Sequence, residues 1–115
     1  MRHRFCIADR ERLHVVKQYV DQHLHEPLRL EELCAMALMN RHKLNEGFQK
    51  YYDKKARAYI LEQRMQKARK LLLESDLSLA EIAETIGYEH ANNFSTAYQK
   101  FYGHAPSKER QLNSL

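Results

Sequence analysis

The segment from Ser78 to Arg110, SLAEIAETIGYEHANNFSTAYQKFYGHAPSKER, decides the fold of this 115-residue chain. Ser78 and Glu81 have the spacing of a capping box, in which a hydroxyl and a carboxylate each accept a backbone N–H where a helix begins. The apolar residues that follow are three and four positions apart. This spacing predicts a short amphipathic helix, which Gly87 ends because glycine adopts the left-handed conformation without steric cost.

A second helical period begins a few residues later and ends at Gly103. The residues expected on its inner face are Phe94, Ala97, Tyr98 and Phe101. After it, Ala105-Pro106-Ser107 resets the chain for one or two further helical turns. A short helix, a glycine-containing turn and a second helix with a polar outer face form a helix-turn-helix pattern.

Four more helices are predicted before Ser78. Capping residues, the apolar period and the break before Pro27 place them at residues 9–25, 30–37, 41–52 and 56–74, with Asp9 and Asn40 as N-caps of the first and third. No segment alternates as a β-strand does. The sequence therefore predicts an all-α fold in which a long central helix joins two helix-turn-helix subdomains, with about seven helices in total.

The two subdomains form an internal repeat. Residues 30–51 align with residues 79–101, at an offset of 49 before the turn and 50 after it. We therefore expect a disordered lead or linker remnant at residues 1–8, a first unit at 9–55, a connecting helix at 56–75 and a second unit at 76–115. A helix over residues 56–74 is roughly 28 Å long. A rigid helix of that length can separate two recognition helices by one turn of DNA, about 34 Å.

One motif spans residues 82–110 with its spacing intact. It is Ile82-Ala83-x-x-Ile86-Gly87-Tyr88, followed by Phe94-Ser95-x-Ala97-Tyr98-x-Lys100-x-Tyr102-Gly103-x-x-Pro106-Ser107-x-x-Arg110. It resembles the signature of AraC/XylS-type transcriptional regulators. The resemblance implies binding of double-stranded DNA by two recognition helices in successive major-groove segments, and regulation of bacterial transcription, more often by activation. A shorter match, Asn40-x-x-Lys43-Leu44-x-x-Gly47-Phe48, resembles the branch of that family that controls siderophore and iron uptake.

The first unit departs from the family pattern at two positions. Leu38 and Asp53 stand where the family often has glycine. Leu38 must then adopt a costly left-handed backbone or lie in a reshaped turn, whereas Asp tolerates that region better. A third residue, Gly47, lies inside a predicted helix, where close helix packing or approach to the DNA backbone would explain it.

The resemblance also implies which residues contact DNA. The exposed face of the first recognition helix offers His42, Asn45 and Glu46 to base edges, since Asn binds adenine and Glu accepts from cytosine. In the second helix the corresponding residues are Asn92, Asn93 and Thr96, although Asn92 or Asn93 can instead cap that helix. The expected phosphate contacts are Arg41, Lys43, Lys50, Arg64, Ser95 and Lys100.

The net charge of +4 and sequence pI of about 9.1 suit a polyanionic partner. Residues 40–57 carry six basic and two acidic side chains, whereas residues 76–99 carry four acidic ones and no Lys or Arg. We therefore expect the first unit to supply most of the attraction to phosphates.

Several other classes of function are disfavoured. Cys6 and Cys34 have no metal or redox spacing, Cys34 is expected to be buried, and the seven His residues form no HExxH motif. No nucleophile elbow or phosphate loop appears. We therefore expect no enzymatic activity, no metal and no cofactor.

The sequence also lacks a membrane-spanning run and a signal peptide. We therefore expect a cytoplasmic, nucleoid-associated protein with no membrane partner. At this length the chain has no room for an effector domain, and RNA polymerase is a further candidate partner. A helical protein-interaction module that does not bind DNA is the main alternative. An RNA-binding module is less favoured, because the aromatic residues have buried spacing.

Overall fold

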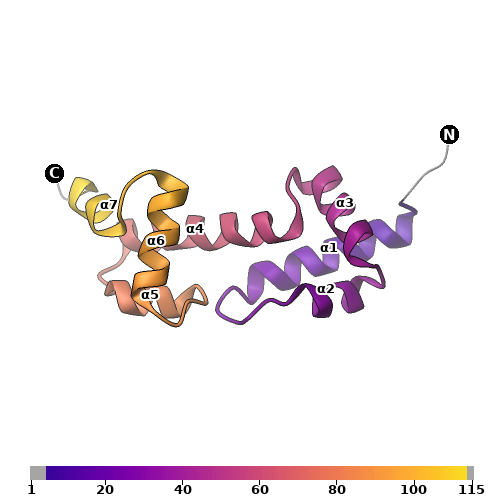
Figure 1. The fold of residues 1–115 in the computed structure, drawn as a ribbon, viewed down its shortest axis with the longest axis horizontal. Coiled ribbons are helices and arrows are strands. Elements are labelled where there is room, and N and C mark those ends of the chain that lie inside the picture. The colour runs from indigo at the N-terminus through magenta and orange to yellow at the C-terminus, as the bar shows by residue number, and fades with distance from the viewer. Residues whose placement is uncertain (1–4, 114–115) are drawn as a thin grey trace. The chain divides into compact units, whose positions relative to one another are not determined.

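The computed structural model describes residues 5–113 (Figure 1). These residues form seven helices: α1 (Ile7–Gln22), α2 (Leu30–Ala37), α3 (Arg41–Tyr52), α4 (Ala56–Glu74), α5 (Leu79–Thr85), α6 (Ala91–Tyr102) and α7 (Pro106–Asn113). No strand occurs among them, so the all-α prediction is confirmed. The predicted disordered lead at residues 1–8 falls partly outside the described residues. In the described part Phe5 is buried, and the helix begins at Ile7.

The chain divides into two compact units. The first comprises the chain up to His23 together with Pro27–Leu61, and the second comprises Leu24–Glu26 and the chain from Glu62 onward. Helix α4 supplies its first turns to the first unit and its remainder to the second.

The first unit packs α1, α2 and α3 against one another (Figure 1). Its largest fully buried side chains include Leu13, Leu33, Leu44 and Phe48. Gly47 lies at the contact between α3 and α1. A Cβ atom there would lie 2.5 Å from Leu13 Cδ1 and 3.1 Å from Phe5 Cε1. Close helix packing therefore accounts for this glycine.

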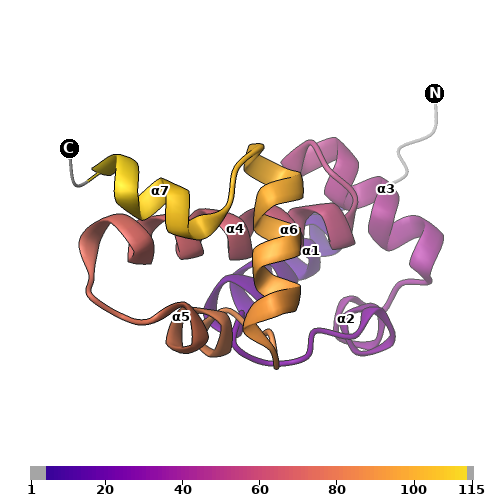
Figure 2. The same ribbon diagram turned by 60° about the vertical axis from the view of Figure 1, so that its left-hand side comes forward.

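The second unit has its own core. It is formed by Met65, Ala68, Leu72, Ile82, Ala83, Ile86, Phe94 and Tyr98. Helix α7 runs alongside the end of α4 (Figure 2), where Arg110 donates hydrogen bonds to the carbonyls of Leu72, Ser75 and Leu77. This guanidinium satisfies one carbonyl in the last turn of α4, that of Leu72, and two in the segment that follows the helix.

Helix α1 differs from the prediction at both ends. Its N-cap is Cys6 rather than Asp9, and Asp9 lies at the third helical position, where its carboxylate accepts the Cys6 N–H at 3.2 Å. The helix ends at Gln22 instead of continuing to His25. Beyond this point the carbonyls of Leu24 and Glu26 accept hydrogen bonds from Arg64, so they need no helical partner.

The bounds of the helices reproduce the internal repeat. Helices α2 and α5 begin 49 residues apart (30 and 79), and α3 and α6 begin 50 apart (41 and 91). The repeat continues beyond the predicted segment, since α4 and α7 also begin 50 residues apart (56 and 106).

The two positions at which the first unit lacks a glycine, Leu38 and Asp53, match glycines of the second unit. Leu38, with φ of 56°, corresponds to Gly87 with φ of 92°, and Asp53, with φ of 68°, corresponds to Gly103 with φ of 87°. The first unit therefore keeps the positive-φ backbone of the second without its glycines. Leu38 adopts the costly left-handed conformation, and its side chain is 75% exposed.

Three predicted core residues are less buried than expected, and one of them, Ala97, is partly buried. Phe101 is 39% exposed, because Phe94 and Tyr98 fill the core and the Phe101 ring contacts Tyr102 edge-on. Cys34 is only partly buried.

Candidate nucleic-acid interface

The start of α3 is fixed by Asn40, as predicted. Its side-chain oxygen accepts the Lys43 N–H at 2.8 Å, and this bond caps the helix. Two predicted base-contacting residues, His42 and Glu46, lie one turn apart, with His42 Nε2 2.8 Å from Glu46 Oε1. The His42 side chain is 80% exposed and that of Glu46 is 32% exposed. This part of α3 therefore presents a polar surface with both donor and acceptor groups.

Asn45 makes a contact that the sequence pattern did not predict. Its Oδ1 accepts the backbone N–H of Ala56, the first residue of α4, at 3.1 Å. The first N–H groups of a helix have no partner within that helix, so Asn45 caps α4 from a neighbouring helix. A bidentate contact to adenine needs the same oxygen. Asn45 therefore has a structural role that competes with the predicted one.

The start of α6 presents the second polar surface. The N-cap is His90, so Asn92 and Asn93 are the second and third residues of the helix, and neither is the N-cap. Both are exposed, as is Thr96, whose hydroxyl donates to the Asn92 carbonyl at 3.0 Å. The alternative that one Asn caps α6 is therefore wrong, because the helix begins earlier than that alternative requires.

The predicted phosphate-contacting residues have different surroundings. Lys50 and Lys100 are exposed on α3 and α6. Arg41 is also exposed, and its Nη2 lies 3.3 Å from Glu31 Oε1. Ser95 is partly buried. The exposed cations Arg41, Lys50 and Lys100 retain side chains that solvent, and hence a phosphate, can reach.

Arg64 is bound to main-chain carbonyls of the protein rather than exposed for a phosphate. Its Nε donates to the Leu24 carbonyl at 3.2 Å and its Nη2 to the Glu26 carbonyl at 2.8 Å. Burial lowers the pKa of this guanidinium. Gly87 lies against the same group, because a Cβ there would be 2.5 Å from the Leu24 oxygen and 3.0 Å from Arg64 Nη2. Arg64 therefore holds the segment after α1 within the second unit.

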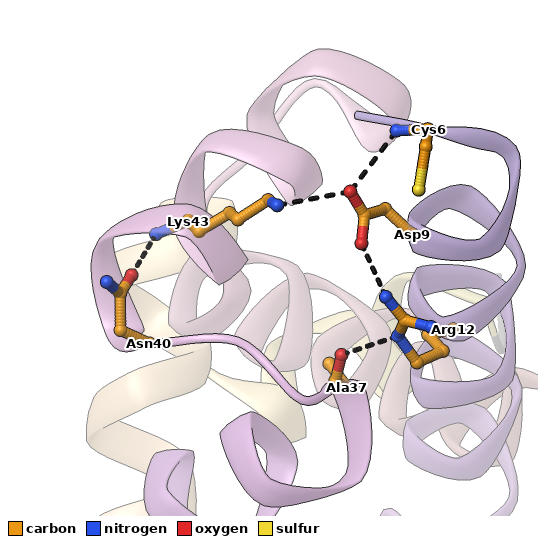
Figure 3. Close-up of polar contacts among 6 residues, drawn as sticks. All are labelled: Cys6, Asp9, Arg12, Ala37, Asn40 and Lys43. Carbon is orange, nitrogen blue, oxygen red and sulfur yellow. Dashed lines mark hydrogen bonds and ion pairs between the residues drawn. The ribbon is translucent and has the colours of Figure 1, made fainter. Parts of the chain in front are cut away.

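Lys43 is engaged by a residue that the sequence pattern identified only as a helix cap. Its Nζ lies 3.1 Å from Asp9 Oδ2, and Asp9 is only 6% exposed (Figure 3). The same carboxylate accepts from Arg12 and from the Cys6 N–H. The hydrogen bond from Lys43, followed by that from the Cys6 N–H, lowers the Asp9 pKa to about 2.

A second buried carboxylate holds α6. Glu109 in α7 is 7% exposed and accepts from the Tyr98 hydroxyl at 2.7 Å and from Arg69 Nε at 3.1 Å. His104 Nε2 lies 3.0 Å away. Burial raises the pKa of Glu109, but the hydrogen bonds from Tyr98 and His104 and the charge on Arg69 outweigh it and leave the pKa below its ordinary value. Each recognition helix is thus held by a carboxylate within its own unit.

The sequence contains signals for two of the structural roles described above, those of Asp9 and Asn45. Cys6 and Asp9 have the three-residue spacing of a capping box, with Asp at the third helical position. Pro106 corresponds to Ala56 in the repeat and has no N–H, whereas Ala56 has one that needs an acceptor. Extended to α4 and α7, the repeat therefore marks the Ala56 N–H as a group that needs an acceptor, and the structure supplies Asn45 Oδ1.

Within residues 5–113, no group of three or more His, Cys, Asp or Glu side chains is arranged to hold a metal ion. Among the helices that the structure describes, none combines the length and apolar character needed to cross a membrane.

Comparison with known proteins places this pair of helix-turn-helix units in a family. The "Helix-turn-helix domain" family model matches residues 33–112. The transcriptional regulator GbdR of Pseudomonas aeruginosa is 31% identical over 108 residues, which cover 94% of this chain and 29% of GbdR. The chain spans about three tenths of the length of GbdR, of PocR of Salmonella typhimurium and of ArgR of Pseudomonas aeruginosa. None of these relatives is named for iron or siderophore uptake.

Solved structures agree in fold. The C-terminal domain of AraT, a response regulator from Geobacillus stearothermophilus, has a TM-score of 0.82 at 27% identity, covering 96% of this chain and 88% of that domain. The DNA-binding domain of AdpA, a global transcriptional factor solved in complex with a target DNA, also has a TM-score of 0.82 at 27% identity, covering 88% of this chain and 91% of that domain. The chain belongs to the helix-turn-helix family of AraC-type DNA-binding domains found in transcriptional regulators.

Proposed function

We propose that the chain binds a specific double-stranded DNA site, with the N-terminal parts of α3 and α6 entering successive segments of the major groove. The observation that carries this proposal is the similarity to the AdpA domain, which was solved on a target DNA. The exposed polar residues at the start of both helices support it, since recognition helices contact bases through their N-terminal residues.

The exposure of the side chains supports a proposed division of the contacts. His42 and Glu46 are proposed to read bases in the first unit, and Asn92, Asn93 and Thr96 in the second. Lys50, Lys100 and Arg41 are proposed to contact phosphates, because their side chains are exposed. Three residues are left out of these direct contacts because each is bound within the fold: Asn45 Oδ1 accepts from the Ala56 N–H, Lys43 pairs with the buried Asp9, and Arg64 donates to two main-chain carbonyls.

The whole protein is proposed to regulate bacterial transcription in the cytoplasm, on the nucleoid. RNA polymerase is proposed as a further partner, and the effector domain is proposed to lie outside this chain. Activation is the expected sign of regulation. No catalytic step is proposed.

Two experiments test the proposal: selection of bound duplexes from a random pool, and a titration of binding against salt concentration. The selected duplexes are expected to contain two sequence boxes about ten base pairs apart, because recognition helices on one face of DNA are one turn apart. Affinity should fall linearly on a log–log plot against salt. A helical protein-interaction module would show no salt-dependent affinity for any duplex, and that result would refute the proposal.

A further inference from the structure

We infer that Asp9 is a positioning residue for the base-reading surface of α3. This inference rests on the proposed function and adds to it a residue outside both helices of the first helix-turn-helix. Asp9 lies in α1, is 6% exposed, and does not lie on the polar surface formed by His42 and Glu46.

The carboxylate of Asp9 is tied to the end of α2 through Arg12. Arg12 Nη2 donates to Asp9 Oδ1, and Arg12 Nε donates to the Ala37 carbonyl at 3.0 Å (Figure 3). Ala37 is the last residue of α2. One guanidinium therefore joins the buried carboxylate to the point at which the chain leaves that helix.

The other oxygen of Asp9 is tied to the start of α3. Lys43 Nζ lies 3.1 Å from Oδ2, and the Lys43 backbone N–H donates to Asn40 Oδ1 at 2.8 Å. Lys43 is thus held at both its main chain and its side chain. Because Lys43 is in the first turn of α3, this contact constrains how that helix rotates about its axis.

The segment between these two attachments needs such a constraint. It begins with Leu38, which has φ of 56° and is 75% exposed, so its own side chain does little to fix it by packing. Asp9 holds the chain on both sides of this strained turn. A small change in the turn would move His42 and Glu46, which lie within the next two turns of α3.

The second unit does not share this arrangement. Asn93 occupies the position of Lys43 and has no charge for a carboxylate to hold. His90 occupies the position of Asn40 and makes no side-chain cap bond. The inference therefore concerns only the first recognition helix.

Removal of the charge tests it. In Asp9→Asn the contact to Lys43 loses its charge, and the ammonium becomes available to DNA. The probes are a duplex that the unmodified chain selects from a random pool and a scrambled duplex of the same length. The measured quantity is the dissociation constant for the scrambled duplex divided by that for the selected duplex. We expect this ratio to fall about tenfold, while the scrambled duplex binds as tightly as before or more tightly. The salt slope should steepen by about one unit, because one more phosphate is neutralised.

The matched control is Asp21→Asn. Asp21 is also an ion-paired acid of α1, and it accepts from Lys17 and from the Tyr59 hydroxyl. This variant changes the net charge equally but should leave the ratio unchanged. Equal effects of both variants would reduce Asp9 to a general charge effect and overturn the inference. A proportional loss of affinity for both duplexes would assign it a purely structural role, with the same consequence.

A second variant keeps the test valid if Asp9→Asn does not fold, as judged by circular dichroism. Arg12→Gln breaks the tie to Ala37 but leaves the Asp9–Lys43 pair, and Arg10→Gln, at an exposed position of α1, matches its charge. Only Arg12→Gln should lower the ratio, and an unchanged ratio would overturn the inference. If the unmodified chain itself shows no salt-dependent binding of any duplex, the proposed function fails first, and the inference fails with it.

Discussion

The side-chain oxygen of Asn45 accepts a hydrogen bond from the backbone N–H of Ala56 at 3.1 Å, so a residue of the recognition helix caps the helix that follows it. The sequence pattern favours Asn45 as a base-contacting residue. The contact shows that its oxygen already has a partner. The corresponding pair in the second unit, Ser95 and Pro106, needs no such bond, because proline has no N–H.

Asn45→Ala is therefore expected to lower the free energy of unfolding by about 1 kcal/mol, the usual cost of losing a helix cap. Urea unfolding measures it. Ser95→Ala is the control and should change stability by less than about 0.5 kcal/mol, as expected away from such features. Asn45→Asp separates the two roles, since it keeps the acceptor oxygen but lacks the amide donor. If it lowers binding of the selected and scrambled duplexes equally, Asn45 does not read a base.

Gly87→Ala should be more destabilising than Gly103→Ala. Both positions have positive φ, which costs an alanine about 1–2 kcal/mol. Only at Gly87 would the new Cβ also meet a backbone oxygen, that of Leu24 at 2.5 Å, whereas Gly103 has nothing within 4 Å. Thermal unfolding of the two variants isolates the steric term. Equal losses would contradict the close approach of Leu24.

Leu38→Gly is expected to stabilise the chain by about 0.5–1 kcal/mol. Relief of the left-handed strain exceeds the entropy that glycine adds to the unfolded chain, and the exposed side chain gives up little buried area. Asp53→Gly, at the position that corresponds to Gly103, should gain less because Asp tolerates this conformation better. Chemical denaturation of the two variants and the unmodified chain measures these changes in the free energy of unfolding. A destabilised Leu38→Gly would indicate that the leucine side chain makes a stabilising contact.

Lys50→Gln should change the salt dependence of DNA binding and not stability, whereas Arg64→Gln should change stability and not the salt dependence. Lys50 is exposed on α3, so its loss should reduce the slope of log affinity against log salt by about 0.9 with little change in stability. Arg64 donates to two carbonyls, so its loss should destabilise the fold by about 1–3 kcal/mol and leave the slope unchanged. A flatter slope for Arg64→Gln in folded protein would restore its predicted role as a phosphate contact.

Acid should weaken the fold through Asp9. Its pKa of about 2 in the folded chain lies below the value of about 3.9 expected when unfolded, so its contribution is complete above about pH 4 and is lost as the pH falls towards 2. Asp9→Asn lacks this contribution at every pH. Its free energy of unfolding should therefore decline less steeply between pH 4 and pH 2, as urea titrations at several pH values would measure. Parallel curves for the two proteins would contradict the contact with Lys43.

The sequence by itself determined the helices whose signals are local. The bounds of α2, α3 and α4 are those predicted, because caps such as Asn40 and the 3.6-residue apolar period act within one or two turns. The repeat and the motif at residues 82–110 predicted the two helix-turn-helix units and the family for the same reason: they are patterns along the chain.

Tertiary structure decided where α1 ends and what the polar side chains contact. Arg64, Lys43 and Asn45 look alike in sequence as exposed or DNA-facing polar residues. Their partners, the Leu24 carbonyl, Asp9 and the Ala56 N–H, lie 40, 34 and 11 residues away along the chain. A polar side chain can turn towards solvent or towards a hydrogen-bonding partner within the fold with the same helical period. Only the packing of the helices within each unit brings that partner within hydrogen-bonding distance. This packing separates the residues available to DNA from those that hold the fold.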